Sequence, residues 1–249
     1  MAELPPHRLL GSGAPPIVVL NGAGARLGYW KNLTDGLAGL STVLFYDRKV
    51  PPRSTELPLL GAHYVEELRA LLMELGLAPP YLLVAHSMGG LYADLFARLY
   101  PDEVAGLVLV DASHPDQERR FAPRMNRFGR FFRGVIDGWD RLFGPGAFTE
   151  VVRFESIAAE IAAAPAFPDI PLTVITAGAT PPAWLISAEL WDVHLANQEE
   201  LTALSPRGRQ LIAEASDHHV PVRQPQLIVD AVRDMLAGMK KGPGVLPGP

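Results

Sequence analysis

One serine stands in a context that can make its hydroxyl a nucleophile. Ser87 follows the apolar run Tyr81–Val84 and precedes a helical pattern that begins at Gly90. A strand that becomes a helix within one residue strains the backbone there, and the small residues Ala85 and Gly89 leave room for such a turn. The turn would expose the hydroxyl beside the free N–H groups of the helix start, which favour negative charge. The alternative is a serine that only caps the helix.

A nucleophilic serine needs a base to accept its proton, and two adjacent histidines are candidates. His218 and His219 lie after a strand expected at Gln210–Ala213 and before a helix expected at Pro225–Met239. They could also be surface histidines in a turn. A metal site is disfavoured because neighbours in an extended loop point apart and no third ligand has matching spacing. We therefore expect no metal and no cofactor.

With these residues in place, the chain resembles the α/β-hydrolase fold superfamily, in particular bacterial esterase-like serine hydrolases with a His-Ser-x-Gly-Gly turn. The resemblance extends from about Ile17 to Met235. It implies a catalytic triad in which Ser87 is the nucleophile and His218 the base. His219 stands where such relatives often carry a bulky residue, so it would pack against the substrate pocket or line it.

The third member of the implied triad, a carboxylate, is open in the sequence. Many relatives carry it after the seventh strand, but here the strand Leu172–Thr176 is followed by no acid until Glu189 and Asp192. Asp111 directly follows the family's sixth strand, Leu107–Val110, at the sheet edge where catalytic groups collect. We expect Asp111 to be the acid, with Asp192 and Glu189 as alternatives; an aspartate that only caps its loop also fits.

The same resemblance implies an oxyanion hole made of two backbone N–H groups. Met88 would supply one, and Ala23 (or Gly24) the other, from the glycine-rich loop that opens with Asn21-Gly22 where many relatives have His-Gly. That loop lacks the spacing and the Lys-Ser/Thr of nucleotide sites. The residues expected to line the substrate pocket are Asn21, Gly22, Gly24, His86, Phe131, Phe132, Trp139 and His219.

The elements that must position these residues alternate between strand-like and helical patterns. This alternation predicts an α/β fold with a mostly parallel sheet and helices on both faces. Strands are expected at Ile17–Leu20, Val43–Tyr46, Tyr81–Val84, Leu107–Val110, Leu172–Thr176 and Gln210–Ala213, with room for one more at His7–Leu10. Helices are expected near Trp30–Leu40, Tyr64–Leu75, Gly90–Tyr100 and Pro225–Met239.

A segment of roughly 60 residues after Asp111 is too long for a plain connection and predicts a helical cap. Its apolar residues recur at helical steps (Phe128, Phe131, Phe132, Val135, Ile136, Trp139, Leu142, Phe143), as do its arginines (Arg119, Arg120, Arg124, Arg127, Arg130, Arg133). We favour a cap over the site, completed by Val151–Ala164, above a helix resting on a membrane. The arginines could favour a substrate carboxylate or only be solvated. The expected organisation is a core at 1–111 and 171–239, a cap at 112–170 and a flexible tail at 240–249.

Composition limits the classes of protein. The 249 residues and 48% hydrophobic content suit one α/β domain, and the net charge of −5 argues against a nucleic-acid partner. The absence of cysteine excludes disulfides, cysteine nucleophiles and thiolate metal sites. The N-terminus lacks signal-peptide features, and no run of about 18 apolar residues occurs. We expect a cytoplasmic protein.

The predicted function is a cofactor-independent hydrolase that cleaves a carboxylic ester, thioester or lactone with an apolar portion through an acyl-enzyme. A serine at position 87 disfavours haloalkane dehalogenases and epoxide hydrolases, which need an aspartate there. Carbon–carbon bond hydrolysis, lyase or perhydrolase chemistry can use the same triad, and a ligand-binding receptor without turnover is a further alternative. The sequence does not indicate the natural substrate or the oligomeric state.

Overall fold

The computed structural model describes residues 4–49, 60–124, 153–183 and 186–240. Its strands are β1 (His7–Leu10), β2 (Ile17–Leu20), β3 (Val43–Tyr46), β4 (Tyr81–His86), β5 (Val104–Val110), β6 (Leu172–Ala177) and β7 (Gly208–Ala213). The helices are α1 (Thr34–Ala38), α2 (Gly61–Glu74), α3 (Gly89–Leu99), α4 (Gln117–Phe121), α7 (Phe154–Ala163), α8 (Ala188–Thr202), α9 (Val220–Arg223) and α10 (Pro225–Lys240). Short 3-10 turns are η1 (Leu27–Trp30), η2 (Pro101–Glu103) and η3 (Ala122–Arg124).

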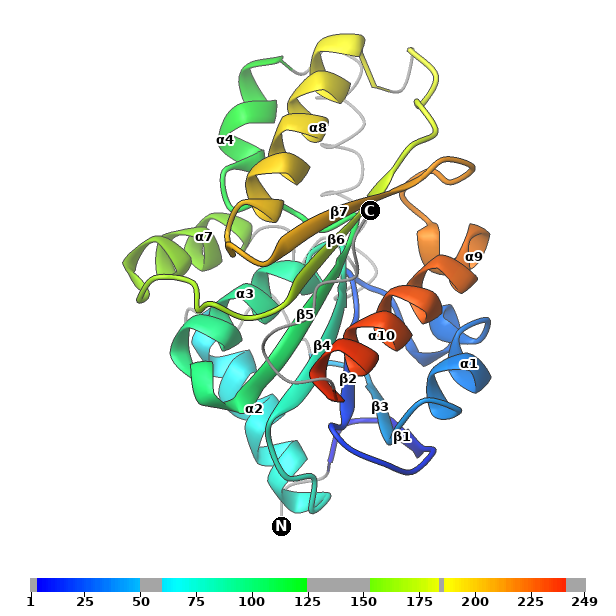
Figure 1. The fold of residues 1–249 in the computed structure, drawn as a ribbon. Coiled ribbons are helices and arrows are strands. Elements are labelled where there is room, and N and C mark those ends of the chain that lie inside the picture. Colours follow the sequence, from blue (N-terminus) through cyan, green and yellow to red (C-terminus); the bar gives the residue numbers. More distant parts are fainter. Residues whose placement is uncertain (1–3, 50–59, 125–152, 184–185, 241–249) are drawn as a thin grey trace, which may run out of the picture.

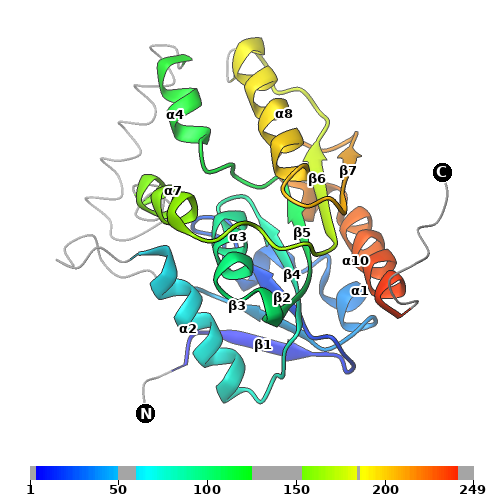
Figure 2. The same cartoon turned by 60° about the vertical axis from the view of Figure 1, so that its left-hand side comes forward.

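The strands form one twisted sheet in the order β1-β3-β2-β4-β5-β6-β7. β1 pairs antiparallel with β3, and every other pairing is parallel. α2, α3 and α7 cover one face of the sheet, and α1 and α10 cover the other (Figures 1 and 2). The predicted α/β fold with a mostly parallel sheet and helices on both faces is confirmed.

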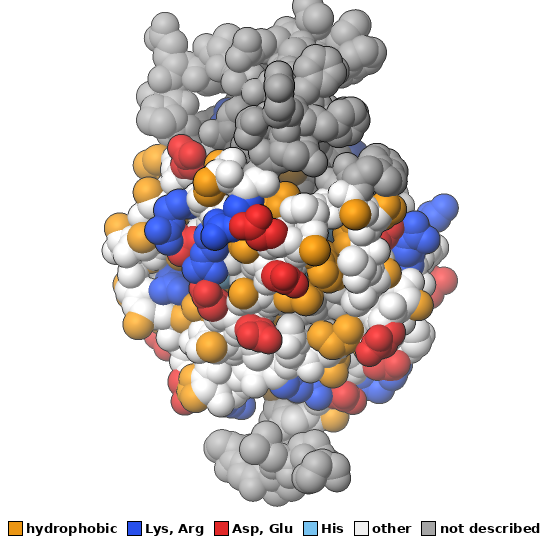
Figure 3. Space-filling model, turned by 90° about the horizontal axis from the view of Figure 1, so that it is seen from above, with side chains coloured by type: hydrophobic (Ala, Val, Ile, Leu, Met, Phe, Trp, Pro, Cys, Tyr) orange, Lys and Arg blue, Asp and Glu red, His pale blue; other side chains and the backbone are white. Residues whose placement is uncertain are grey.

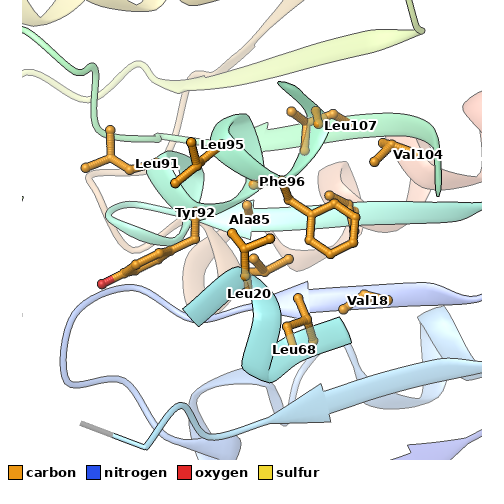
Figure 4. Close-up of a cluster of buried hydrophobic side chains, with 14 of the residues drawn as sticks. Val18, Leu20, Leu68, Ala85, Leu91, Tyr92, Leu95, Phe96, Val104 and Leu107 are labelled. Atoms are coloured by element: carbon orange, nitrogen blue, oxygen red, sulfur yellow. The ribbon is translucent and has the colours of Figure 1, made fainter. Parts of the chain in front are cut away.

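Two apolar clusters hold these layers together. On one face, Leu68 of α2 and Phe96 of α3 are buried together with Leu20 and Leu107 of the sheet (Figure 4). On the other face, Trp30 and Val232 belong to a second buried cluster. β2 and β3 are apolar and buried along their whole length because both of their faces are covered. Complete burial fixes the strand positions and therefore the loops at the strand ends.

The direction in which successive strands are added to the sheet reverses at β2. This reversal brings the predicted site loops together. β2 lies between β3 and β4, so the chain first builds outward on one side of β2 and then crosses to the other side. Pockets in parallel sheets form at the carboxyl ends of strands beside such a switch point. Leu20 of β2 pairs with Ala85 of β4, and His86 of β4 pairs with Val110 of β5. The loops after β2, β4 and β5 therefore emerge side by side.

Several helical regions differ from the sequence expectation. The helix expected at Trp30–Leu40 is divided into η1 and α1, in a segment where Gly36 and Gly39 weaken a continuous helix. α8 was not predicted, because its buried side includes the polar residues Asn197 and Gln198 and shows no apolar stripe. α10 extends to Lys240, one residue into the segment predicted as a tail; residues 241–249 lie outside the described residues.

Only the two ends of the predicted cap fall within the described residues. At its start, α4 lies against α8, and the Arg120 guanidinium donates to both carboxylate oxygens of Glu200 at 2.8 and 2.7 Å. At its end, α7 buries Phe154 and Ile157 in the same cluster as α2 and α3. The predicted aromatic run from Phe128 to Phe143 lies outside the described residues.

The arginines of α4 and η3 do not form an unpaired basic face. Arg119 pairs with Asp116, and Arg124 pairs with Glu189, each at 3.0 Å. Seen from above, basic side chains lie among acidic ones (Figure 3). Among the helices of the described ranges, none combines the length and apolar character that crossing a bilayer requires.

We expect Gly89→Ala to lower the free energy of unfolding by about 1–3 kcal/mol, the usual range for overpacking. A Cβ atom at this position would lie 2.5 Å from the Leu20 carbonyl oxygen and 2.7 Å from that of Asn21. Both neighbours are backbone atoms, so the start of α3 would have to move away from β2. Urea unfolding measures the change.

Gly238→Ala is the matched control, because a Cβ atom at Gly238 in α10 would meet no heavy atom within 4 Å. That substitution should stabilise the protein by about 0.5–1 kcal/mol through higher helix propensity. Equal unfolding midpoints for the two variants would contradict the close approach of α3 to β2.

Candidate active site

Ser87 lies in the turn between β4 and α3 with a strained backbone. Its φ is +53°, in the left-handed region that residues other than glycine rarely adopt. The conformation is held from both sides: the Ser87 N–H donates to the Val110 carbonyl at 3.1 Å, and the Ser87 carbonyl accepts from Gly90 at 2.9 Å and Ser113 at 3.0 Å. Strain that is held in this way is typical of functional positions.

The glycine-rich loop after β2 packs directly against this turn. A Cβ atom at Gly22 would lie 3.1 Å from the Ser87 Cβ and 3.0 Å from the His86 Nδ1. Arg48 is buried behind the loop, and its guanidinium donates to the carbonyl oxygens of Asn21 at 2.6 Å and Gly22 at 3.3 Å. In a trans peptide the C=O and N–H point in opposite directions. The N–H of Ala23 therefore points away from Arg48.

Asn21 holds this loop with its side chain. The side chain is buried, its Nδ2 donates to the Tyr46 carbonyl at 2.9 Å, and its Oδ1 accepts from the Trp30 indole. Nδ2 also lies 3.3 Å from Asp47 Oδ1, which accepts the Leu27 N–H at 2.8 Å. This differs from the expectation that Asn21 lines the substrate pocket. The Asn21 amide points into the protein because its hydrogen-bond partners lie there.

Asp111 and His218 meet at the carboxyl end of the sheet. Asp111 Oδ2 lies 2.7 Å from His218 Nδ1, and Asp111 Oδ1 accepts the Ala177 N–H at 2.9 Å. Like Ser87, Asp111 has a left-handed backbone, with φ +42°. The Asp111 side chain is 3% exposed, whereas that of His218 is 49% exposed. The imidazole thus has one nitrogen fixed by a buried carboxylate while half of its side-chain surface is open to solvent.

A third residue, His194 of α8, also contacts this carboxylate. His194 Nε2 lies 3.1 Å from Asp111 Oδ1. Burial acts to raise the pKa of Asp111, but the hydrogen bonds and charges of His194 and His218 outweigh it and hold that pKa well below its usual range. Asp111 is therefore ionised throughout the neutral range. The sequence analysis did not identify His194.

The alternative acids lie away from this pair. Glu189 is on the surface, where its carboxylate pairs with Arg124 at 3.0 Å. Asp192 is exposed on α8. Of the three candidate acids, Asp111 is the one whose carboxylate contacts the His218 imidazole.

His86 is buried directly beneath His218. The two rings are 4.7 Å apart between centroids, and His86 Nε2 lies 2.9 Å from the His218 carbonyl oxygen. A carbonyl only accepts, so the His86 Nε2 carries the proton and donates. Burial, together with the nearby charge of His218, lowers the pKa of His86 to about 3. His86 thus supports the histidine loop from inside instead of lining the pocket as expected.

This buried neutral histidine predicts a loss of stability in acid. As pH falls below about 6.5, His86 gains a proton in the unfolded chain but stays neutral in the folded chain until about pH 3. The unfolded state then binds more protons, so His86 lowers the free energy of unfolding by up to about 1.4 kcal/mol per pH unit across this window. Urea unfolding of the wild type and His86→Gln between about pH 7 and pH 4 should show a shallower dependence in the variant.

His63→Gln provides the control, because His63 is an exposed histidine on α2 beside Glu67. We expect its pH dependence to match that of the wild type. A His86→Gln curve parallel to the wild-type curve would show that His86 is not a buried neutral group in the folded protein.

His219 lies on the outer side of the histidine loop. Its side chain is exposed, and its Nδ1 lies 3.1 Å from the hydroxyl oxygen of Tyr29. Burial, with the negative charges of Asp217 and Asp111, raises the pKa of Tyr29 to about 12, so the phenol stays protonated. Tyr29 and His219 together form an aromatic wall beside His218.

The remaining predicted site residues divide into two groups. Met88 directly follows Ser87 as the N-cap of α3 and is buried, while Gly24 is exposed with φ +65°. Phe131, Phe132 and Trp139 lie outside the described residues. Within the ranges that the structure describes, no group of three or more His, Asp or Glu residues is placed to hold a metal ion.

Comparison with known proteins identifies the family. Residues 15–144 match the family profile described as alpha/beta hydrolase fold, so the chain belongs to this family. The esterase of Thermogutta terrifontis is 23% identical, with 94% of this chain and 93% of that chain covered and a TM-score of 0.61. A putative lipase of Acinetobacter baumannii is 17% identical, with 94% and 88% covered and a TM-score of 0.69.

A curated relative matches only a short part of the chain. An uncharacterized protein of Schizosaccharomyces pombe is 40% identical over 67 residues, which are 26% of this chain and 12% of that protein. The family membership thus agrees with the resemblance inferred from the residues, and the fold is that of many esterases and lipases.

Proposed function

We propose that this protein is a serine hydrolase that cleaves a carboxylic ester through an acyl-enzyme intermediate. The observation that carries the proposal is the placement of a strained serine and a histidine–carboxylate pair on one sheet edge. Ser87 follows β4, Asp111 follows the adjacent strand β5, and His218 follows β7. His86, which directly precedes Ser87, supports the proposed base by donating a hydrogen bond to the His218 carbonyl oxygen at 2.9 Å.

In the proposed reaction, the Ser87 hydroxyl oxygen attacks the carbonyl carbon of the ester. His218 Nδ1 is bound to Asp111 Oδ2, so Nε2 accepts the serine proton. Ionised Asp111 stabilises the imidazolium that forms. His218 then returns the proton to the departing alkoxide, leaving an acyl group on Ser87. A water molecule, deprotonated by the same nitrogen, then attacks the acyl carbon. The bond to the Ser87 oxygen breaks, that oxygen takes the proton back from His218, and the acid is released.

The negative charge that develops on the carbonyl oxygen requires donors that are in place before the reaction. We assign this role to the N–H groups of Met88 and Ala23. Met88 stands at the N-terminus of α3, where backbone N–H groups favour an anion. The loop with Ala23 is held by Arg48 through two carbonyl groups. Donors that cannot reorient stabilise the transition state without a reorganisation penalty.

The direct test combines turnover with covalent labelling. We expect the purified protein to hydrolyse short-chain aryl esters and to lose activity on reaction with a fluorophosphonate, which modifies activated serines. Mass spectrometry of the digest should place the adduct on the peptide that contains Ser87. A series of acyl chain lengths then reports the size of the pocket.

Other outcomes separate the alternatives. Perhydrolase or carbon–carbon bond chemistry would appear as a labelled Ser87 with slow ester turnover, because the triad would be intact but the pocket suited to another substrate. A receptor-like protein would show neither labelling nor turnover. That last result would overturn the proposed function.

A further inference from the structure

The catalytic acid proposed above is held by an additional helix, α8, which the triad does not include. Asp111 Oδ1 accepts a hydrogen bond from His194 Nε2 at 3.1 Å, while Asp111 Oδ2 binds His218. Asp111 Oδ1 thus accepts from His194 and from the Ala177 N–H, and Asp111 Oδ2 binds the proposed base, His218. Each oxygen has its own histidine.

α8 also contacts the loop that contains Asp111 through a second residue, four positions after His194. The Gln198 Nε2 donates to the carbonyl oxygen of Ala112, the residue after Asp111, at 2.8 Å. Gln198 is fully buried, so this bond is shielded from water. Residues i and i+4 lie on the same side of a helix. His194 and Gln198 therefore act from one face of α8 on two successive residues.

The ring of His194 is itself fixed. Trp191 stacks on it with centroids 5.0 Å apart and an interplanar angle of 27°. The His194 side chain is only 14% exposed. An ionised carboxylate accepts hydrogen bonds and donates none, so the proton between the two residues belongs to His194 Nε2. His194 therefore stabilises the negative charge of Asp111.

We propose that His194 is a positioning residue that orients the Asp111 carboxylate and shares its charge, and thereby controls how strongly His218 holds a proton. This inference rests on the proposed function. If Asp111 gives part of its charge to His194, less remains to attract the proton on His218. The pair would then be tuned by a residue that does not touch the substrate.

Other titratable groups lie near Asp111 and His194. The charge of Asp111 also interacts with His86 at the end of β4 and with Tyr29 of η1. Glu189 and Glu200 of α8 pair with Arg124 of η3 and Arg120 of α4, respectively. These ion pairs are unchanged by a substitution at position 194.

The test compares His194→Phe, which keeps a flat ring without a donor, with His194→Gln, whose Nε2 can still donate. For His194→Phe we expect kcat to fall about 10- to 100-fold, the usual effect of losing such a supporting partner, while KM stays the same. The acid limb of the kcat/KM profile should move to higher pH. His194→Gln should recover most of kcat and the wild-type profile. His63→Phe, a histidine on α2 that pairs with Glu67, is the matched control.

A second measurement does not depend on turnover. The pH at which the His218 ring signals titrate by NMR should be higher in His194→Phe than in the wild type and restored in His194→Gln. If the wild type cleaves no ester, the proposed function fails, and the NMR titration still decides the role of His194. Should His194→Phe not fold, His194→Leu takes its place. Wild-type kcat and titration in the folded variant, or no recovery with glutamine, would overturn the inference.

Discussion

Replacement of Ser87 by alanine is expected to lower kcat for an aryl ester by about 10⁴-fold or more, as loss of the nucleophile does in serine hydrolases. The acyl-enzyme cannot form without the hydroxyl oxygen. Residual hydrolysis would come from the oxyanion donors and from substrate binding alone. The measurement is steady-state turnover of wild type and variant, together with the loss of fluorophosphonate labelling.

Ser113→Ala is the matched control for this variant. Ser113 is nearly buried beside the site, but it contacts Ser87 through its backbone N–H, which donates to the Ser87 carbonyl at 3.0 Å. That bond survives removal of the Ser113 hydroxyl. We expect wild-type activity from Ser113→Ala. Unchanged activity in Ser87→Ala would rule out the proposed nucleophile.

The strand pattern and the serine turn could be predicted because their signals are local. A strand buried on both faces must be apolar along its length, so β2 and β3 occupy the predicted ranges without change. The turn at Ser87 needs small neighbours, and the reason is visible at Gly89, where a side chain would collide with the end of β2. Both requirements involve residues that are close together in the sequence, so the sequence alone reveals them.

Orientation of side chains in the site was harder to predict. Asn21 directly follows β2 and His86 ends β4, yet both side chains point into the protein and bond to backbone carbonyls. Whether a polar side chain faces the pocket or the core depends on the partner that tertiary packing supplies. Those partners, at Tyr46 and His218, lie 25 and 132 residues away in the sequence.

The supporting roles of Arg48 and His194 were also missed. The sequence analysis did not single out Arg48, and the structure shows its guanidinium bound to the loop that follows β2. His194 lies on a helix whose buried side includes polar residues, so hydrophobic periodicity does not detect it. Trp191, His194 and Gln198 nevertheless recur at helical spacing. A polar stripe at such spacing is the signal that could have located α8 and its contact with Asp111.

The arrangement around Asp111 also predicts a large effect for Asp111→Asn. Asparagine has one acceptor oxygen and one donor amide where the carboxylate has two acceptors. The Oδ1 position receives two donors, His194 and the Ala177 N–H, so the amide oxygen should remain there. The NH₂ group would then face His218 Nδ1 and donate to it. His218 would carry its proton on Nε2, the nitrogen that must accept the proton of Ser87.

We therefore expect Asp111→Asn to lower kcat by about 10³- to 10⁴-fold through the wrong histidine tautomer, with the fold retained. Asp192→Asn is the control, because Asp192 is exposed on α8; it should keep wild-type activity. Turnover of folded protein, checked by urea unfolding, distinguishes the two. Loss of activity in Asp192→Asn alone would transfer the acid role to α8 and leave Asp111 as a residue that only holds its loop.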